Sequence, residues 1–127
     1  MNTKESMLKK KIWAVIGANN DPEKFGNKIY KKLKYEGYTV YPVNPRYDNV
    51  DGDPCYPNLS SLPEIPEVLD MVVSPKVGKA FIEEASKLGI KNIWLQPGTC
   101  DQETLELLKE RHLVGLQACV LVALSDT

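Results

Sequence analysis

Cysteine and histidine are scarce in this sequence of 127 residues. The three cysteines are an odd number, and none stands in a Cys-x-x-Cys pair. We therefore expect neither a disulfide framework nor a cysteine-rich zinc site, and a reducing compartment fits the composition better. A single histidine, His112, gives no basis for a Ser/His/Asp triad or for a histidine metal centre.

Long hydrophobic runs and an excess of charge of one sign are also missing. The apolar run that ends at Leu124 is too short to cross a bilayer, and the opening six residues lack the apolar centre of a signal peptide. We therefore expect no membrane insertion and no secretion, and we predict a cytoplasmic protein. Sixteen Lys and Arg against seventeen Asp and Glu give a net charge of −1. Domains that bind nucleic acid are usually strongly basic, so no nucleic-acid partner is expected.

The length and the 43% hydrophobic content suit one globular domain over residues 1–127, with a core over about 11–124. Its charge is unevenly distributed. Residues 1–46 carry ten Lys and Arg against four Asp and Glu, whereas residues 47–127 carry six against thirteen. This asymmetry fits a lysine-rich, solvated helix face, and it equally fits a local attraction for an anionic small molecule.

Apolar runs alternate with helical patterns from the start of the chain. Residues 12–16 form an uninterrupted apolar run, which is typical of a strand buried on both faces. Phe25, Ile29 and Leu33 then recur at a spacing of four, with lysines between them. This pattern predicts an amphipathic helix that ends near Gly37, where a glycine suits the C-terminal cap.

The alternation continues through the middle of the chain. The β-branched and aromatic residues 38–43 predict a short second strand, and residues 44–66 are rich in turn formers. Residues 69–73 predict a third strand. Ser74 then provides an N-cap followed by proline at the first helical position, and Gly89 ends that helix.

The last part of the chain repeats this pattern. Residues 90–95 predict a fourth strand, Thr99 or Asp101 caps a helix that ends near His112, and residues 114–124 form a final apolar segment. Strands separated by helices imply right-handed βαβ crossovers and hence a mostly parallel sheet. We therefore predict an α/β fold in three layers, doubly wound around a five-stranded, Rossmann-like sheet.

In such a sheet, ligands bind beyond the carboxyl ends of the strands, where the strand order reverses. After the first strand, two glycines frame a loop that leads into a helix, whose free N–H groups suit an anion such as phosphate. The loop lacks both the Gly-x-Gly-x-x-Gly fingerprint and the P-loop lysine, and its glycines could serve only as turn and packing positions. The candidate binding residues here are Gly17, Ala18, Asn19, Asn20, Lys24, Phe25 and Gly26.

The second strand ends in Asn44, Pro45 and Arg46, without the carboxylate that usually binds the ribose of NAD. An arginine there suits a phosphate on the ribose, which NADP and coenzyme A carry and NAD lacks. Arg46 is equally compatible with an ordinary surface position.

Two further strand ends add polar groups to the same edge. Ser74, Pro75 and Lys76 follow the third strand, and Gln96, Pro97 and Gly98 follow the fourth. Lys76 could lie along a ribose or pyrophosphate or simply be exposed. The side chain of Gln96 could donate to a ligand or cap a strand end.

Taken in order, several segments resemble the stand-alone CoA-binding domain family, whose fold also occurs in the N-terminal domain of the succinyl-CoA synthetase alpha subunit. The resemblance covers residues 11–124 and implies a Rossmann-like CoA binder, with the pyrophosphate on the first loop and adenine near Asn44 and Pro45. Asn19 departs from the serine that many relatives carry, so amide donors would replace a hydroxyl contact to phosphate. The matching segments are residues 14–19, Pro22, Phe25, Gly26, residues 41–45, residues 70–73, Pro75, residues 94–98 and Cys119.

Cysteine is the remaining candidate for chemistry. Cys100 stands near a helix start, where the pKa of a thiol falls, and Cys119 begins the last apolar run. Either thiol could form a mixed disulfide with CoA, although core packing also explains Cys119. We expect no catalytic residue and no metal.

The sequence thus predicts a protein that binds coenzyme A or an acyl-CoA without catalysis, as a carrier, sensor or regulatory module. Its partner would be the small molecule, with a homo-oligomer or an enzyme subunit as further possibilities. Two alternatives stay open. One is an NADP-linked or other nucleotide-binding regulatory domain, and the other is a small cysteine-dependent acyl-CoA enzyme.

Overall fold

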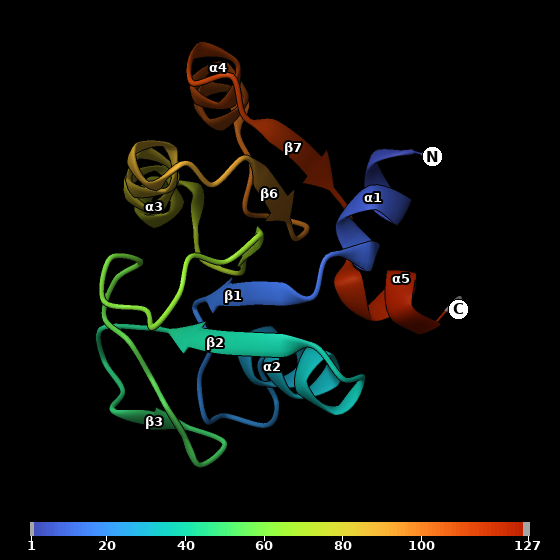
Figure 1. Cartoon of the computed structure of the whole chain (residues 1–127), viewed down its shortest axis with the longest axis vertical. Coiled ribbons are helices and arrows are strands. Elements are labelled where there is room, and N and C mark those ends of the chain that lie inside the picture. Colours follow the sequence, from blue (N-terminus) through green and yellow to red (C-terminus); the bar gives the residue numbers. More distant parts are fainter. Residues whose placement is uncertain (1, 126–127) are drawn as a thin grey trace.

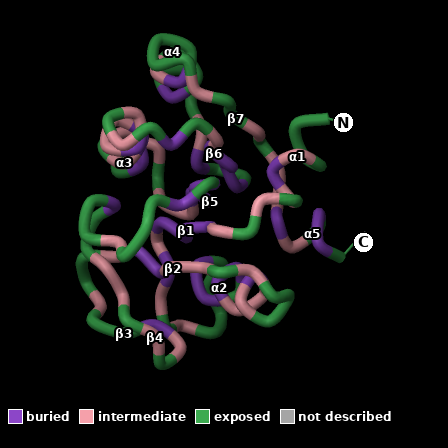
Figure 2. Tube along the Cα trace, in the orientation of Figure 1, coloured by how far each residue is buried: buried purple, intermediate pink, exposed green. Residues whose placement is uncertain are grey.

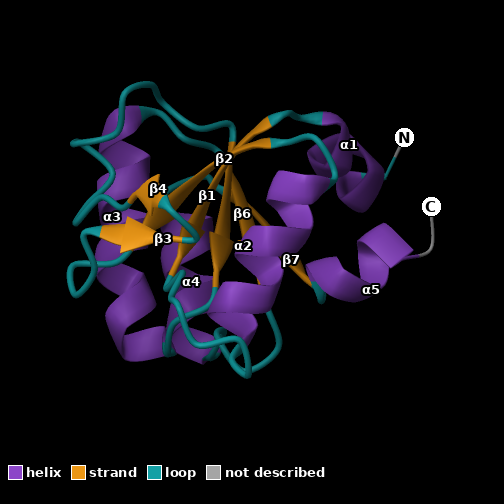
Figure 3. Cartoon of the chain, turned by 90° about the horizontal axis from the view of Figure 1, so that it is seen from below, coloured by secondary structure: helices purple, strands orange, loops and turns teal. Residues whose placement is uncertain are grey.

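A computed structural model describes residues 2–125, and its centre is a parallel sheet with the strand order β2-β1-β5-β6-β7. Helices cover both faces of this sheet (Figure 1, Figure 3). The predicted α/β, doubly wound fold is therefore confirmed. The sheet strands are β1 (Ile12–Ile16), β2 (Thr39–Val43), β5 (Val68–Met71), β6 (Asn92–Leu95) and β7 (Val114–Gln117). The helices are α1 (Thr3–Lys9), α2 (Phe25–Tyr35), α3 (Pro75–Leu88), α4 (Gln102–Glu110) and α5 (Val120–Ser125).

The strand order reverses between β1 and β5. The chain passes from β1 outward to β2 and then returns to β5 on the other side of β1. Gly17 leaves β1 with φ of +98°, and a Cβ at this position would lie 2.8 Å from Cγ1 of Val73 and 3.0 Å from the carbonyl oxygen of Val72. A glycine therefore allows the ends of β1 and β5 to meet closely at the edge where a ligand is expected.

The central strands β1, β5 and β6 are largely buried (Figure 2), and side chains that alternate along them contribute to a core on each face of the sheet. Under α2 and α5, Trp13 and Trp94 are fully buried with ring centroids 5.6 Å apart. Under α3 and α4, Ile16 and Met71 contribute to the second core. Burying one such side chain stabilises the fold by roughly 1.5–3 kcal/mol, so these paired layers hold the carboxyl edge of the sheet rigid.

One polar group is buried in the middle of the sheet. Asp70 on β5 is fully buried between Val15 and Trp94 on the neighbouring strands. Within the described residues, neither of its carboxylate oxygens has a hydrogen-bond partner. Burial raises the pKa of Asp70 well above its usual value, because the ionised form would lose its hydration without compensation.

The turn-rich region contains a short hairpin that the sequence did not predict, formed by β3 (Asn49–Val50) and β4 (Asp53–Pro54). Nζ of Lys34 on α2 lies 3.1 Å from Oδ2 of Asp51 and 2.8 Å from Oδ2 of Asp53. The hydroxyl of Tyr30 also donates to Asp53 over 2.6 Å. Contacts with a helix far away in the sequence therefore fix this hairpin.

The two ends of the described chain also differ in detail from the prediction. Helix α1 was not expected, yet the side chain of Asn2 accepts from the amide of Glu5, and Met7 is buried against the first core. The final apolar segment is not continuous. Its first part forms β7, and after Ala118 and Cys119 it turns into α5. The helix stops predicted at Gly37 and Gly89 are confirmed, since both glycines have positive φ just beyond α2 and α3.

Candidate functional site

A cavity of about 520 Å³ opens at the carboxyl edge of the sheet, between the loops that follow β1, β5 and β6. Its position matches the reversal of strand order, and residues from all three loops meet there. The lining residues are Asn19, Glu23, Lys24, Phe25, Gly26, Val72, Val73, Ser74, Gln96, Pro97, Gly98, Thr99 and Cys119.

Two helices begin at this cavity with their N-terminal ends uncapped by side chains. In the described structure, neither the Lys24 side chain at the start of α2 nor that of Ser74 at the start of α3 makes a capping hydrogen bond. Neither helix has an acidic residue in its first turn. By contrast, Asp101 caps α4 by accepting from the amide of Thr104 over 2.8 Å. The positive ends of α2 and α3 are therefore available to an anion.

The loop between β1 and α2 is held by its own hydrogen bonds. Oδ1 of Asn19 accepts from the amide of Asp21 over 3.0 Å, and the carbonyl of Asn19 accepts from Nδ2 of Asn27 over 2.9 Å. A Cβ on Gly26 would lie only 2.2 Å from the carbonyl oxygen of Gly17. The packing role considered for this glycine is thus present, and the same residue also lines the cavity.

The mouth of the cavity combines charged and aromatic side chains. Lys24 and Glu23 both line it, so their formal charges balance, and Phe25 is 61% exposed beside them. The half-buried Val72 and Val73 and the exposed Pro97 provide apolar wall. The arrangement offers a polar, helix-lined entrance and an apolar interior.

Gln96 organises the far wall of the cavity. Its side chain is buried, and Oε1 accepts from the amide of Val120 over 3.1 Å. Its carbonyl accepts from the hydroxyl of Thr99 over 2.7 Å, and this bond closes the turn that contains Gly98. The side chain therefore holds the start of α5 against β6 and fixes the neighbouring Cys119 beside the cavity.

Cys119 and Cys100 differ in their position relative to the cavity. Cys119 is half-buried and lines the cavity as a free thiol. Cys100 does not line it, and burial together with the charge of Asp101 raises the pKa of the Cys100 thiol. The expectation that a helix start lowers this pKa is therefore wrong, because the carboxylate of Asp101 already occupies the start of α4.

Several predicted binding residues lie outside the cavity lining. Asn20 connects the loop to the β3–β4 hairpin, because its Nδ2 donates to the carbonyl of Asn49 over 2.7 Å and its Oδ1 accepts from the amide of Asp51. Asn44 holds the same loop by donating to the carbonyl of Ala18 over 3.0 Å. The predicted residues absent from the lining are Gly17, Ala18, Asn20, Asn44, Pro45, Arg46, Pro75 and Lys76.

The segment after β2 lies beyond β1, at the same edge of the sheet as the cavity. Pro45 and Arg46 are exposed, and the Arg46 amide donates to Oδ1 of Asn44. The structure thus places these residues on the adjoining surface and brings their loop to the first loop through Asn44.

Four lining residues were missed from the sequence. Val72 and Val73 were interpreted as the end of a strand, but β5 ends at Met71 and both valines continue into the cavity wall. Glu23 and Thr99 stand next to predicted residues. The rule that ligands bind just beyond each strand was sufficient to find Thr99 and the two valines.

We also searched the described part of the chain for a metal site, a membrane-spanning helix and a histidine at the cavity. Within residues 2–125, no group of three or more His, Cys, Asp or Glu side chains is placed to hold a metal ion. None of the helices there is long and apolar enough to cross a membrane. His112 is exposed just beyond α4 with φ of +57°, and it is not among the residues that line the cavity.

Comparison with protein families gives one match over most of the chain. A family profile described as "CoA binding domain" matches residues 11–125. Among curated proteins, the chain is 37% identical over 122 residues to acetate–CoA ligase (ADP-forming) I of Archaeoglobus fulgidus, covering 88% of this chain and 18% of the ligase. It is 30% identical over 128 residues to the uncharacterized protein YneT of Bacillus subtilis, covering 94% of this chain and 90% of YneT.

Solved structures give the same pattern. A hypothetical protein from Pyrococcus horikoshii OT3 superimposes with a TM-score of 0.86 at 36% identity, covering 92% of this chain and 82% of the other. The dinucleotide-forming acetyl-coenzyme A synthetase 1 of Ca. Korarchaeum cryptofilum gives a TM-score of 0.74 at 27% identity, covering 88% of this chain and 27% of the synthetase. The chain therefore spans under a third of these two enzymes, and nearly the full length of the smaller relatives.

Proposed function

Because this chain belongs to the CoA-binding domain family, we propose that it binds coenzyme A or an acyl-CoA at the carboxyl edge of its sheet. It does so without catalysing a reaction, as a carrier, sensor or regulatory module. The observation that carries this proposal is the pair of uncapped helix starts, α2 and α3, at one cavity with an apolar interior. A ligand with a pyrophosphate and a long uncharged arm fits both features.

The pyrophosphate would lie on the loop that leads into α2. No side chain caps the start of this helix, and Lys24 adds a positive charge beside the cavity. Asn19 also lines this part of the cavity, and its side-chain amide can donate to a phosphate oxygen in place of a serine hydroxyl. The pantetheine arm would then follow the apolar wall formed by Val72, Val73 and Pro97.

The adenosine end would extend toward the segment after β2. In this proposal, adenine lies near Asn44 and Pro45, and the exposed guanidinium of Arg46 pairs with the phosphate on the ribose. The hydrogen bond from Asn44 to Ala18 supports this arrangement, since it ties that segment to the phosphate-binding loop. The ligand would therefore cross from the cavity onto the surface beside it.

The absence of catalysis is also part of the proposal. Among the described lining residues, the ionisable groups are Glu23, Lys24 and the thiol of Cys119. The single histidine, His112, is not among the lining residues, so it is not placed to activate that thiol. Three free cysteines also favour the reducing environment of the cytoplasm, where we propose that the protein acts.

Ligand-induced stabilisation tests the proposal directly. CoA and desulfo-CoA should raise the melting temperature more than NAD does at equal concentration, because a ligand that binds only the folded state stabilises it by mass action. NADP is the informative comparison. Strong stabilisation by NADP without any by CoA would contradict the proposal and favour a nucleotide-binding regulatory domain.

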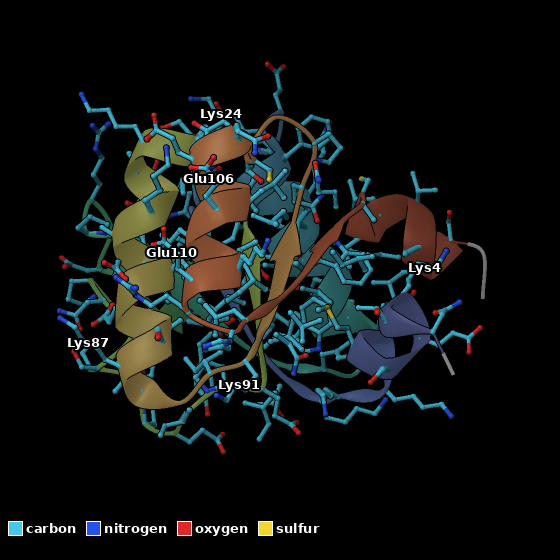
Figure 4. The ribbon with its side chains drawn as sticks, turned by 90° about the horizontal axis from the view of Figure 1, so that it is seen from above. Lys4, Lys24, Lys87, Lys91, Glu106 and Glu110 are labelled. Carbon is cyan, nitrogen blue, oxygen red and sulfur yellow. The ribbon has the colours of Figure 1, made fainter. Side chains whose placement is uncertain are left out.

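A pair of lysine variants locates the binding site. Lys24→Gln should weaken CoA binding by roughly three- to fivefold in calorimetry, with a smaller dependence on salt, since a partly exposed charge near a phosphate contributes about 0.5–1 kcal/mol. Lys87→Gln is the matched control, because Lys87 lies on α3 away from Lys24 (Figure 4) and lines a different surface groove. Equal effects of the two variants would show that general charge, and not this cavity, attracts the ligand.

A further inference from the structure

The two edges of the sheet are protected to different degrees. The segment after β4 covers β2, because the amide of Tyr56 donates to the carbonyl of Pro42 over 3.0 Å and its carbonyl accepts from the amide of Asn44 over 2.9 Å. On the other side, no strand within residues 2–125 pairs with the outer edge of β7. One side of the sheet therefore ends in an open strand.

The hydrogen-bonding groups on this open edge can be assigned from the pairing of β7 with β6. The amides of Val114 and Ala118 donate to the carbonyls of Lys91 and Leu95. Since direction alternates along a strand, the N–H and C=O groups of Gly115 and Gln117 point away from β6. They form a ready template for one more strand.

The edge also lacks charged side chains and proline, two of the features that normally prevent pairing. Val114 is 44% exposed, Gly115 and Gln117 are exposed, and residues 113–124 contain no charged side chain although 26% of the chain is charged. Native proteins usually block an open edge with charges, proline or a covering element. Seen from above, β7 runs between α4 and α5 with no ribbon over it (Figure 4).

The neighbouring helix keeps its carboxylates away from this edge. Glu103, Glu106 and Glu110 line the groove between α4 and α3 (Figure 4). At 100° per residue, Leu105 falls on the opposite side of α4, toward β7, and it is 41% exposed. An apolar, uncharged strip thus follows the open edge, and an identical strip would meet no like charge there.

We propose that β7 pairs with β7 of a second copy of this chain, antiparallel around a twofold axis at Gly115. In this register the outward groups of Gly115 pair with those of the partner's Gly115, and the amide of Gln117 faces the carbonyl of the partner's Leu113. The amide of Leu113 stays bonded to the carbonyl of Leu108 within its own chain.

The same register also matches the side chains. Val114 lies opposite the partner's Leu116 on one face, and Leu116 lies opposite the partner's Val114. Centring the axis on Gly115 therefore pairs the outward groups of Gly115 and the outward amide of Gln117, and it covers the exposed valine as well. A strand of unrelated sequence would have to supply both matches, whereas a second copy supplies them by symmetry.

Sedimentation velocity of the full chain tests this pairing. The wild-type protein should dimerise as its concentration rises from about 5 to about 500 µM, and Val114→Lys should weaken the dimer at least about tenfold, because each ammonium group would face an apolar side chain. Ile65→Lys is the matched control, since Ile65 is also exposed, at 58%, but lies in the loop before β5. This variant should dimerise like the wild type.

Hydrogen exchange of the wild-type protein gives a measurement that needs no variant. The amides of Gly115 and Gln117 should become more protected as the protein concentration rises, while those in the loop around Ile65 should not change. A protein that stays monomeric to about 500 µM would overturn the proposal and leave the edge to a different partner. So would a dimer that survives Val114→Lys, or one whose β7 amides show no added protection.

Discussion

Replacing Asp70 by asparagine should remove a pH dependence of stability that the fold itself creates. The carboxyl group is fully buried and lacks a hydrogen-bond partner within the described residues, and its pKa is raised by burial alone. Asparagine has nearly the same shape but does not titrate. The substitution therefore isolates the cost of keeping this group protonated.

The sign and size of this pH dependence of stability follow from proton linkage. Between the ordinary pKa of an aspartate, about 4, and the raised pKa of folded Asp70, the unfolded chain has released the proton and the folded chain still holds it. The stabilising effect is therefore complete below about pH 4 and is lost as the pH rises, by about 1.4 kcal/mol per pH unit. Each pH unit over which the folded group keeps its proton therefore lowers the melting temperature by roughly 5 °C for a domain of this size.

Urea unfolding at several pH values between 4 and 8 measures the effect. The difference in unfolding free energy between Asp70→Asn and the wild type should grow with pH over this range, in favour of the variant. Glu106→Gln, which removes an exposed carboxylate on α4, is the control for the loss of one negative charge. If the wild type and Asp70→Asn show parallel pH profiles, Asp70 is ionised in the folded state and the reasoning fails.

Three further predictions concern the edge of the cavity. Gly26→Ala should lower the free energy of unfolding in urea by about 2–3 kcal/mol, because the added Cβ would lie 2.2 Å from the carbonyl oxygen of Gly17. Gly98→Ala should lower it by only about 1–2 kcal/mol, because Gly98 has a positive φ but open space around it. Equal losses would contradict this reasoning. Hydrogen bonds from Thr104 lower the pKa of Asp101 to about 2, so Asp101→Asn should remove stability that the wild type has above about pH 4 and loses toward pH 2; an unchanged acid transition would refute it. Cys100→Ser and Cys119→Ala should each leave desulfo-CoA affinity within about twofold, and fast alkylation of Cys100 at pH 6 would contradict the raised pKa of its thiol.

Local sequence patterns predicted α2, α3, α4 and the first four strands of the sheet, because each of these elements carries its own signal. The run at residues 12–16 became β1 without change, and the glycines after α2 and α3 adopt the positive φ that their caps require. The β3–β4 hairpin carried no such signal. It depends on Lys34, which lies on α2 and pairs with Asp51 and Asp53. Pairings between distant segments are invisible to a pattern read along the chain.

The sequence predicted the position of the candidate site better than the roles of its individual residues. The rule for parallel sheets located the cavity, but several polar residues at the strand ends serve the protein's own backbone. Gln96 was predicted to donate to a ligand or to cap a strand end, and its Oε1 accepts from the amide of Val120, which leaves Nε2 as the group that could donate to a ligand. Asn20 likewise holds the hairpin through the backbone of Asn49 and Asp51. A side-chain amide suits either role equally, so only the positions of its neighbours decide.

The loop between β1 and α2 shows why binding a ligand and supporting the protein's own backbone are difficult to separate. Its carbonyls and side chains bond to one another, and these bonds hold the loop at the start of α2, which no side chain caps. If the ligand had to order this loop, the binding free energy would be less favourable by roughly 1–2 kcal/mol for each residue that becomes ordered. Asn27 and Asn44, whose side chains donate to the backbone of this loop, therefore contribute to affinity by holding the loop in advance. Substituting either should weaken CoA binding through a looser loop, and exchange of the loop amides in the free protein would reveal that loosening before any ligand is added.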